Sequence, residues 1–145
     1  MAQKALARLF NWQPACDGVW INLKEAGGIA FLCYLGGGAG DTYTLQEAKD
    51  ASGTGAQNLA VITEYHTNTG NASDAWTRRT QAAAATVVTA AAATQNAAVF
   101  EVENTQLSDT YKFVKVTSTG AGTVAAAPRD LMVQRTPANL PAMGV

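Results

Sequence analysis

Apolar and polar residues alternate over short stretches along most of this chain, and clusters rich in Gly, Asn and Asp separate the stretches. Alternation places every second side chain on one face, which is typical of strands buried on one side. Short strands with turns at this spacing indicate a sandwich or a barrel. The strands predicted in this way cover 19–23, 42–46, 59–65, 98–103 and 111–116.

The stretch 29–35 differs from the others because it is apolar throughout. Such a run is expected in a central strand that is covered on both faces. Gly27 and Gly28 come directly before it and predict a turn. The glycine-rich tract 36–41 that follows predicts a loop.

The middle of the chain carries two conflicting signals. Alanine runs at 82–85 and 90–93 favour a helix, because Ala has the highest helix propensity. The β-branched run 86–89 between them favours a strand. We predict a strand through 76–88 and an irregular or short helical piece near 90–95.

Both ends of the chain depart from the alternating pattern. Residues 1–16 hold a short amphipathic piece followed by Trp12 and Pro14, which indicates an arm that packs onto a surface. A short strand is expected at 124–127. The tail at 136–145 has two prolines and no charge. Proline lacks an N–H donor and fixes φ, so this tail is neither a central strand nor a helix.

These patterns together predict a mostly all-β protein of one folded domain. Its core, a β-sandwich or barrel-like structure, is expected at 17–127, and a chain of 145 residues is long enough to bury it. Residues 1–16 are expected to form an N-terminal arm. Residues 128–145 are expected to form an extended C-terminal arm that lies across a surface of this protein or of a neighbour.

The surface of this protein is expected to be weakly charged. Charged residues make up 14% of the chain and the net charge is −1, whereas a typical protein has about 25% charged residues. Binding to nucleic acid or to an anionic membrane needs clustered cations, so neither partner is expected. A nearly neutral surface favours association with other proteins, although an ordinary small soluble protein would also fit.

The two cysteines are too few for a disulfide scaffold. Cys33 lies in an apolar run and is expected to pack as a buried thiol. A bridge between Cys16 and Cys33 is one alternative, and we favour two free thiols made in a reducing compartment. The first ten residues lack the apolar core of a signal peptide, so synthesis and folding in the cytoplasm are expected.

No group of residues has the spacing of an active site. His66 is the only histidine, and we interpret it as a surface residue that follows a strand. Glu101 and Glu103 share one strand face and could bind a cation, but a solvated face is the favoured interpretation. We therefore predict no enzyme activity, no cofactor, no metal site and no small-molecule substrate.

Residues 126–140, AAPRDLMVQRTPANL, carry a family resemblance. They resemble the C-terminal signature of small virion proteins of tailed bacteriophages, which are commonly found with the capsid genes. Looser stretches at 41–55, 76–81 and 107–114 are similar to the same group. The resemblance implies a decoration or minor capsid protein on the head exterior, located in the virion after synthesis in the host cytoplasm. Its implied partners are the major capsid protein, copies of this chain, or both.

The partner contacts are expected on the two arms. The residues predicted to make them are Leu9, Phe10, Trp12, Arg129, Asp130, Arg135, Pro137 and Leu140. Either Arg129 or Arg135 is expected to form a charge-assisted pair with an acidic residue of the partner.

Two alternative functions remain open at this point. The protein could be a ring-forming subunit of the tail or of the head–tail junction. It could instead be a β-sandwich module that binds carbohydrate or a host surface, with Trp12, Trp20 and Trp76 as stacking platforms.

Overall fold

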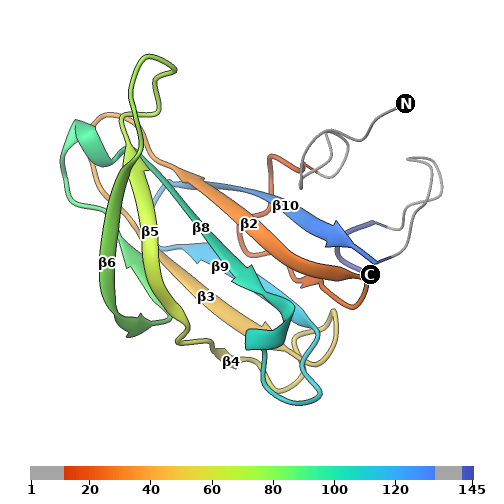
Figure 1. Cartoon of the computed structure of the whole chain (residues 1–145). Coiled ribbons are helices and arrows are strands. Elements are labelled where there is room, and N and C mark those ends of the chain that lie inside the picture. The colour runs from red at the N-terminus through yellow and green to blue at the C-terminus, as the bar shows by residue number, and fades with distance from the viewer. Residues whose placement is uncertain (1–11, 133–141) are drawn as a thin grey trace, which may run out of the picture.

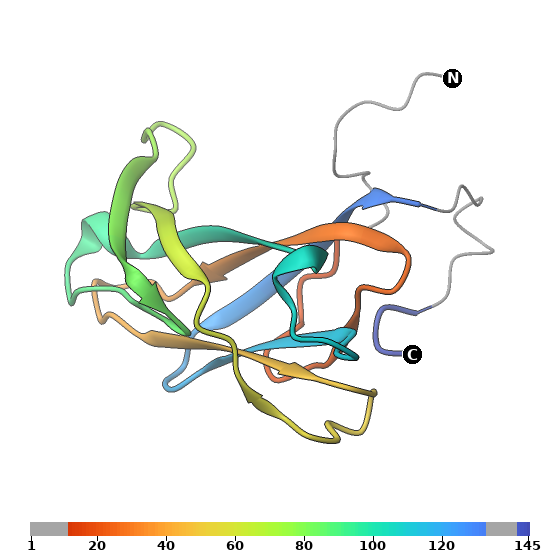
Figure 2. The same cartoon turned by 60° about the horizontal axis from the view of Figure 1, so that its bottom comes forward.

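The chain folds into two antiparallel β-sheets that pack face to face, as seen in a computed structural model that describes residues 12–132 and 142–145 (Figure 1). Strands make up 50% of the described residues. Within the described residues, helix is confined to two 3₁₀ turns, η2 (Ala93–Gln95) and η3 (Asn104–Gln106). The predicted all-β sandwich is confirmed. Figure 2 shows the two layers one above the other.

The first sheet has five strands in the order β10-β2-β8-β5-β6. All neighbouring pairs are antiparallel. The bounds are β2 (Ala26–Tyr34), β5 (Ile62–Asn68), β6 (Thr77–Ala84), β8 (Ala97–Glu103) and β10 (Thr123–Leu131).

The second sheet also has five strands, in the order β1-β9-β3-β4, with β7 paired to β3 beside β4. Its strands are shorter at the edges, and β3 and β9 form its centre. The bounds are β1 (Ile21–Asn22), β3 (Thr42–Ala48), β4 (Gln57–Asn58), β7 (Thr86–Val88) and β9 (Phe113–Ser118).

Segments that cross between the sheets close two sides of the sandwich and make it barrel-like. On one side, residues 59–61 join β4 to β5, and a single residue separates β6 from β7. On the other side, Gln13 pairs with Ala126 of β10, and Asp17 pairs with Val116 of β9. The chain before β1 thus covers the open edge of the first sheet.

The core lies between the layers, where alternate side chains of both sheets meet. Phe31 of β2 and Phe100 of β8 are at most 3% exposed, and their ring centroids are 5.5 Å apart. Burying a side chain of this size contributes about 2–3 kcal/mol to the free energy of folding. The period-two pattern in the sequence therefore correctly predicted which of these side chains point into the core.

Gly27 and Gly28 lie inside β2, so the turn predicted there is wrong. Close packing explains these glycines. A Cβ on Gly27 would lie 2.9 Å from Cβ of Asp130, and one on Gly28 would lie 2.7 Å from the carbonyl oxygen of Val102. Glycine that makes room for a neighbour looks, in a sequence, the same as glycine in a turn.

The strand predicted at 124–127 continues as β10 to Leu131, beyond the expected start of the C-terminal arm. Pro128 is tolerated because β10 lies at the edge of its sheet. Ala126 exchanges hydrogen bonds of 2.9 Å with Gln13 on the outer side of β10. The nitrogen of Pro128, two residues further, points to the same side, so β2 loses no hydrogen bond. Cys16, expected in the N-terminal arm, is also part of the core at 4% exposure.

The strand β2 is central, but only one of its faces is covered, contrary to the prediction for 29–35. Phe31 and Cys33 point into the core and are fully buried. On the opposite face, Ala30 and Leu32 are half-buried and Tyr34 is 45% exposed. The outer side of β2 at 30–34 is therefore apolar and partly open to solvent.

Three other predicted elements differ in their bounds. The strand predicted at 59–65 begins later, as β5, and includes His66, which was placed in a loop. The strand predicted at 19–23 shortens to β1. The single strand predicted through 76–88 is divided at Ala85 into β6 and β7, which belong to different sheets, and η2 takes the place of the short helical piece near 90–95.

Candidate functional site

Five of the predicted contact residues lie outside the described residues: Leu9, Phe10, Arg135, Pro137 and Leu140. The other three lie close to β10. Trp12 is 40% exposed and comes directly before Gln13, which pairs with β10. Arg129 and Asp130 belong to the end of β10 itself. The structure therefore brings the described members of the predicted set to one edge of the sandwich.

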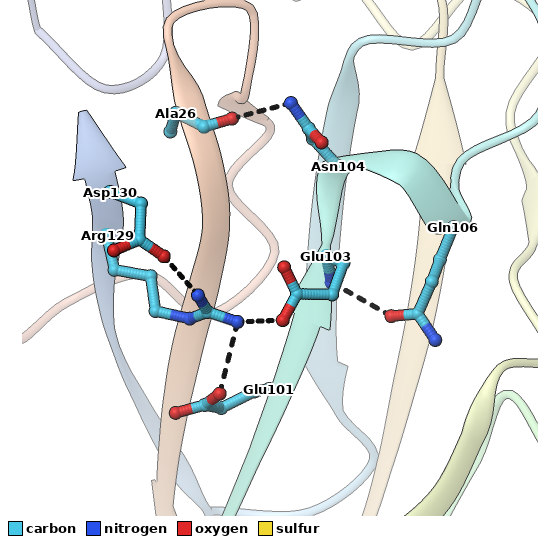
Figure 3. A network of polar contacts seen from close by, with 7 residues as sticks. All are labelled: Ala26, Glu101, Glu103, Asn104, Gln106, Arg129 and Asp130. Atoms are coloured by element: carbon cyan, nitrogen blue, oxygen red, sulfur yellow. Dashed lines mark hydrogen bonds and ion pairs between the residues drawn. The ribbon is translucent and has the colours of Figure 1, made fainter. Parts of the chain in front are cut away.

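Three carboxylates surround the guanidinium of Arg129 on the outer face of the first sheet (Figure 3). Its Nη2 donates to Glu103 and lies 3.2 Å from Oε2 of Glu101, while Nη1 donates to Asp130. The guanidinium reaches β8 by passing over Gly28, because Arg129 and Glu103 are the register partners of Gly28 on its two sides. A Cβ on Gly28 would lie 3.2 Å from Cζ of Arg129.

The charges in this cluster do not balance. One guanidinium, with its side chain 10% exposed, faces three carboxylates whose side chains are 40–59% exposed. Burial by itself would lower the pKa of Arg129, but the hydrogen bonds to Glu103 and Asp130 outweigh it and raise the pKa above its ordinary value. The excess negative charge faces solvent, where water screens it.

Neighbouring elements hold the carboxylates of this cluster in place. The η3 turn follows Glu103 directly, and the backbone N–H of Glu103 donates to the side chain of Gln106 at 2.8 Å. Asn104 donates from Nδ2 to the carbonyl oxygen of Ala26 at 2.9 Å, which ties the turn to β2. Asp130 has a φ of 51°, in the left-handed region that Asp tolerates better than most residues.

The sequence correctly placed Glu101 and Glu103 on one face, but it did not identify their cation. Arg129 was expected to pair with an acidic residue of a partner protein. In the structure, its guanidinium is instead bound by carboxylates of its own chain. An ion pair between Arg129 or Arg135 and a partner protein stays a prediction, and Arg135 lies outside the described residues.

The last four residues return to the same edge of the sandwich. The backbone N–H of Asn22 donates to the carbonyl oxygen of Met143 at 2.8 Å, and its Nδ2 donates to the carbonyl oxygen of Val145 at 2.7 Å. Met143 packs against the core cluster. At the end of β10, the backbone N–H of Met132 donates to the carbonyl oxygen of Glu25 at 2.8 Å. The chain is therefore anchored both before and after residues 133–141.

A hollow of about 560 Å³ lies on the outer face of the first sheet, at the base of the β5–β6 hairpin. We call it the aromatic hollow, because Tyr34 and Trp76, which line it, are 45% and 46% exposed. Its other lining residues are Leu32, Asn68, Gly70, Asn71, Ala72, Asp74 and Ala97. Sequence reasoning singled out Trp76 but missed Tyr34, because the apolar run around it suggested burial.

A smaller hollow of about 370 Å³ opens where β5 diverges from β8. Pairing between these strands ends at His66 and Val99, and Glu64 and Glu101 line the hollow beyond that point. Nε2 of His66 lies 3.9 Å from Glu64, beyond hydrogen-bonding distance. Glu64 is instead bound by Arg78 at 2.7 Å. The geometry provides no oriented acid–base pair.

The buried ionisable groups elsewhere serve the fold. Asp41 is 8% exposed, and burial alone would raise the pKa of its carboxyl. Hydrogen bonds from Ser118, Thr42 and the turn at 120–122 outweigh this and lower the pKa below its ordinary value. Cys16 and Cys33 are buried and not bridged, and burial raises the pKa of both thiols. Neither is an activated nucleophile, because the thiolate is the reactive form.

Within the described residues, no group of three or more His, Cys, Asp or Glu side chains is placed to hold a metal ion. In that same part of the chain, no helix is long and apolar enough to cross a membrane. No protein-family model, no curated protein and no solved structure matches this chain significantly.

Proposed function

We propose that this chain is a structural subunit of a tailed-phage virion that attaches to the capsid as a decoration or minor capsid protein. It binds the major capsid protein, neighbouring copies of itself, or both. Its terminal segments make these contacts, and the β-sandwich serves as the frame that holds them.

The main support is the way the chain is anchored around residues 133–141. This segment contains Arg135, Pro137 and Leu140, which are three of the expected contact residues. Hydrogen bonds at Met132 and Met143 fix its flanks to the sandwich. A segment with both ends fixed loses less conformational entropy on docking than a free tail, so more of its contact energy remains as affinity.

Exposed apolar side chains near the chain termini also support the proposal that the terminal segments form the contact surface. The described residues include seven exposed large hydrophobic side chains, and four of these are Trp12, Val19, Met132 and Val145. Val19 lies beside Gly144, so all four belong to the terminal segments or touch them. Burying such surface against a neighbour contributes about 25 cal/mol per Å² of apolar area.

The resemblance of residues 126–140 to small virion proteins and the low charge of the chain agree with this proposal. Arg129 and Asp130, within this segment, form part of the charged cluster on the outer face. They shape the end of β10, from which residues 133–141 start. In the proposed function they position the contact segment, and other residues contribute most of the binding energy.

The test combines a copy count with a contact variant. Quantitative mass spectrometry of purified particles should give a copy number that matches the many equivalent sites of a capsid lattice. A variant with Arg135→Ala, Pro137→Ala and Leu140→Ala should lower particle occupancy at least about tenfold, since each substitution removes contact surface. Residues 142–145 stay in place, because deleting them would remove the Met143 packing and the Asn22 hydrogen bonds.

Val88→Ala is the matched control, because Val88 is 57% exposed and lies on β7, away from the terminal segments. Its occupancy should equal that of the unaltered protein. A folded triple variant with unchanged occupancy would contradict the contact surface proposed here. A copy number that fits only one ring of subunits per particle would contradict placement on the capsid. It would support a subunit of the tail or of the head–tail junction.

A further inference from the structure

The aromatic hollow has two aromatic side chains that the described part of the chain leaves about half exposed. Tyr34 and Trp76 together leave a large apolar area in contact with water, although each is about half buried. Tyr34 lies at the end of β2, and Trp76 lies in the β5–β6 connection directly before β6, but both line one hollow. Aromatic side chains that gather in this way mark a binding site more often than single exposed residues do.

Two glycines make room for the ring of Tyr34. A Cβ on Gly70 would lie 2.5 Å from Cε2 of Tyr34, and one on Gly36 would lie 2.9 Å from its hydroxyl oxygen. Gly70 also has a φ of 79°, a conformation that favours glycine. Both glycines therefore lie in close contact with this ring, and a larger residue at either position would displace it.

Three polar side chains in the hollow are oriented by backbone hydrogen bonds. Asn68 accepts from the N–H of Gly70 at 2.8 Å, and Asp74 accepts from the N–H of Thr69 at 2.9 Å. Asn71 accepts from the N–H of Ser73 at 3.1 Å. Each bond uses one side-chain oxygen, and a carboxylate or amide carries further atoms for hydrogen bonds.

We propose that the aromatic hollow binds a neutral saccharide. A pyranose ring has an apolar C–H face, which stacks on an aromatic ring, and a rim of hydroxyls, which pairs with amides and carboxylates. The volume of the aromatic hollow, about 560 Å³, is within the range of small-ligand sites. No Lys or Arg is among the described residues that line it, so phosphate and other anions lack a counter-charge there.

The hollow and the terminal contact surface lie at different ends of the molecule. The β5–β6 hairpin stands at one end of the sandwich, while the C-terminus and the end of β10 lie at the other, in both views (Figures 1 and 2). A subunit held by its terminal segments can therefore present the hollow outward. The saccharide site goes beyond the proposed structural function and does not depend on it.

The experiment uses the full chain and an array of neutral oligosaccharides that end in glucose, galactose, mannose, rhamnose or N-acetylglucosamine. The strongest binder is then titrated by isothermal calorimetry against the unaltered protein and against Trp76→Ala and Tyr34→Ala. Each variant should weaken binding at least about tenfold, because each loses a stacking surface. Val88→Ala, an exposed substitution outside the hollow, should bind as the unaltered protein does.

Two results would overturn this proposal. One is the absence of saturable binding to every oligosaccharide on the array. The other is binding that the Trp76→Ala and Tyr34→Ala variants leave unchanged. Occupancy of these variants on particles separates the two functions. If Trp76→Ala removes the protein from particles, the hollow is a protein contact and the saccharide proposal fails. If occupancy persists while saccharide binding is lost, both proposals stand.

Discussion

Asp41 and Arg129 are both buried at the margins of the sandwich, and their charged groups have partners of opposite kinds. Asp41, at the start of β3 in the second sheet, accepts hydrogen bonds from the backbone N–H groups of Thr42, Gly120 and Gly122 and from the hydroxyl of Ser118. Arg129, on β10 of the first sheet, is one donor group shared among three carboxylates. The first site has many donors for one acceptor, and the second has many acceptors for one donor.

The difference shows which site is closed and which is open to a partner. Most of the donors around Asp41 are backbone N–H groups, those of Thr42, Gly120 and Gly122, so they cannot turn toward another molecule. The carboxylates around Arg129 are side chains that are 40–59% exposed. They keep unused acceptor atoms toward solvent, next to the segment that we propose as the contact surface. Asp41 thus stabilises the fold, whereas the Arg129 cluster also shapes a surface.

The largest expected effect is that of Asp41→Asn. The amide cannot accept from all of the donors, and its own N–H₂ group would face N–H groups of the turn. We expect a loss of about 2–4 kcal/mol in the free energy of unfolding, measured by denaturant titration. Asp50→Asn is the control, because Asp50 also caps a turn but lies in an exposed loop. Equal effects of the two substitutions would remove the distinction between the closed site and an ordinary loop cap.

Asp41 should also make stability depend on acid pH. Its pKa is lower in the folded state than in the unfolded state, so between these two values the unfolded chain binds more protons. The contribution of Asp41 to the free energy of unfolding should therefore be fully present above about pH 4, and it should be lost as the pH drops through the lowered pKa. Thermal unfolding at several pH values should show a shallower acid dependence for Asp41→Asn. Identical slopes for the two proteins would contradict the role of this carboxylate.

Gly28→Ala tests the space that the Arg129 cluster needs. The new Cβ would lie 2.7 Å from the carbonyl oxygen of Val102 and 3.2 Å from Cζ of Arg129, so the strands or the guanidinium must move. We expect a loss of about 1–3 kcal/mol in denaturant titration. Ala30→Gly, two residues along the same face of β2, removes a methyl group without crowding and serves as the comparison. A neutral Gly28→Ala would mean that the guanidinium does not need to cross β2.

Arg129→Ala leaves three carboxylates without their cation. Because these carboxylates are half exposed and solvent screens them, we expect a loss of only about 1–2 kcal/mol. Arg129→Lys should recover part of this loss at most, since an ammonium cannot contact three carboxylates in a planar fork. The losses for Arg129→Ala should shrink in high salt if repulsion among the carboxylates causes them. A salt-independent loss would point to packing of the Arg129 stem instead.

The smallest expected effect is that of Glu101→Gln. Glu101 is the most exposed of the three carboxylates, at 59%, and its distance of 3.2 Å to Arg129 adds to two closer contacts. Its removal should change the free energy of unfolding by less than about 0.5 kcal/mol. A loss as large as that of Arg129→Ala would show that Glu101 supplies most of the attraction in the cluster.

The sequence predicted the sandwich because local alternation reports burial directly. It failed where one residue type serves two purposes. Gly27 and Gly28 resemble a turn, yet they make room for Arg129 and Asp130 across the sheet. Pro128 looked like the end of the core, yet an edge strand accepts it. In both cases the deciding neighbour lies about 100 residues away in sequence, where no local pattern can reveal it.

The candidate surfaces divide in the same way. The shared face of Glu101 and Glu103 could be read from their spacing, and Trp76 could be singled out by its residue type. The sequence could not show that a guanidinium lies between the carboxylates, or that Tyr34 and Trp76 line one hollow. Each of these arrangements brings together residues that are distant in the chain.

By itself, the sequence determined the all-β architecture, most of the inward positions and the weak charge of the surface, since composition and period-two alternation act over a few neighbouring residues. Tertiary structure alone decided which charges are paired within the chain, where the terminal segments are anchored, and which exposed aromatic side chains share a hollow. These outcomes depend on strand order and register, which arise only when distant segments pack together.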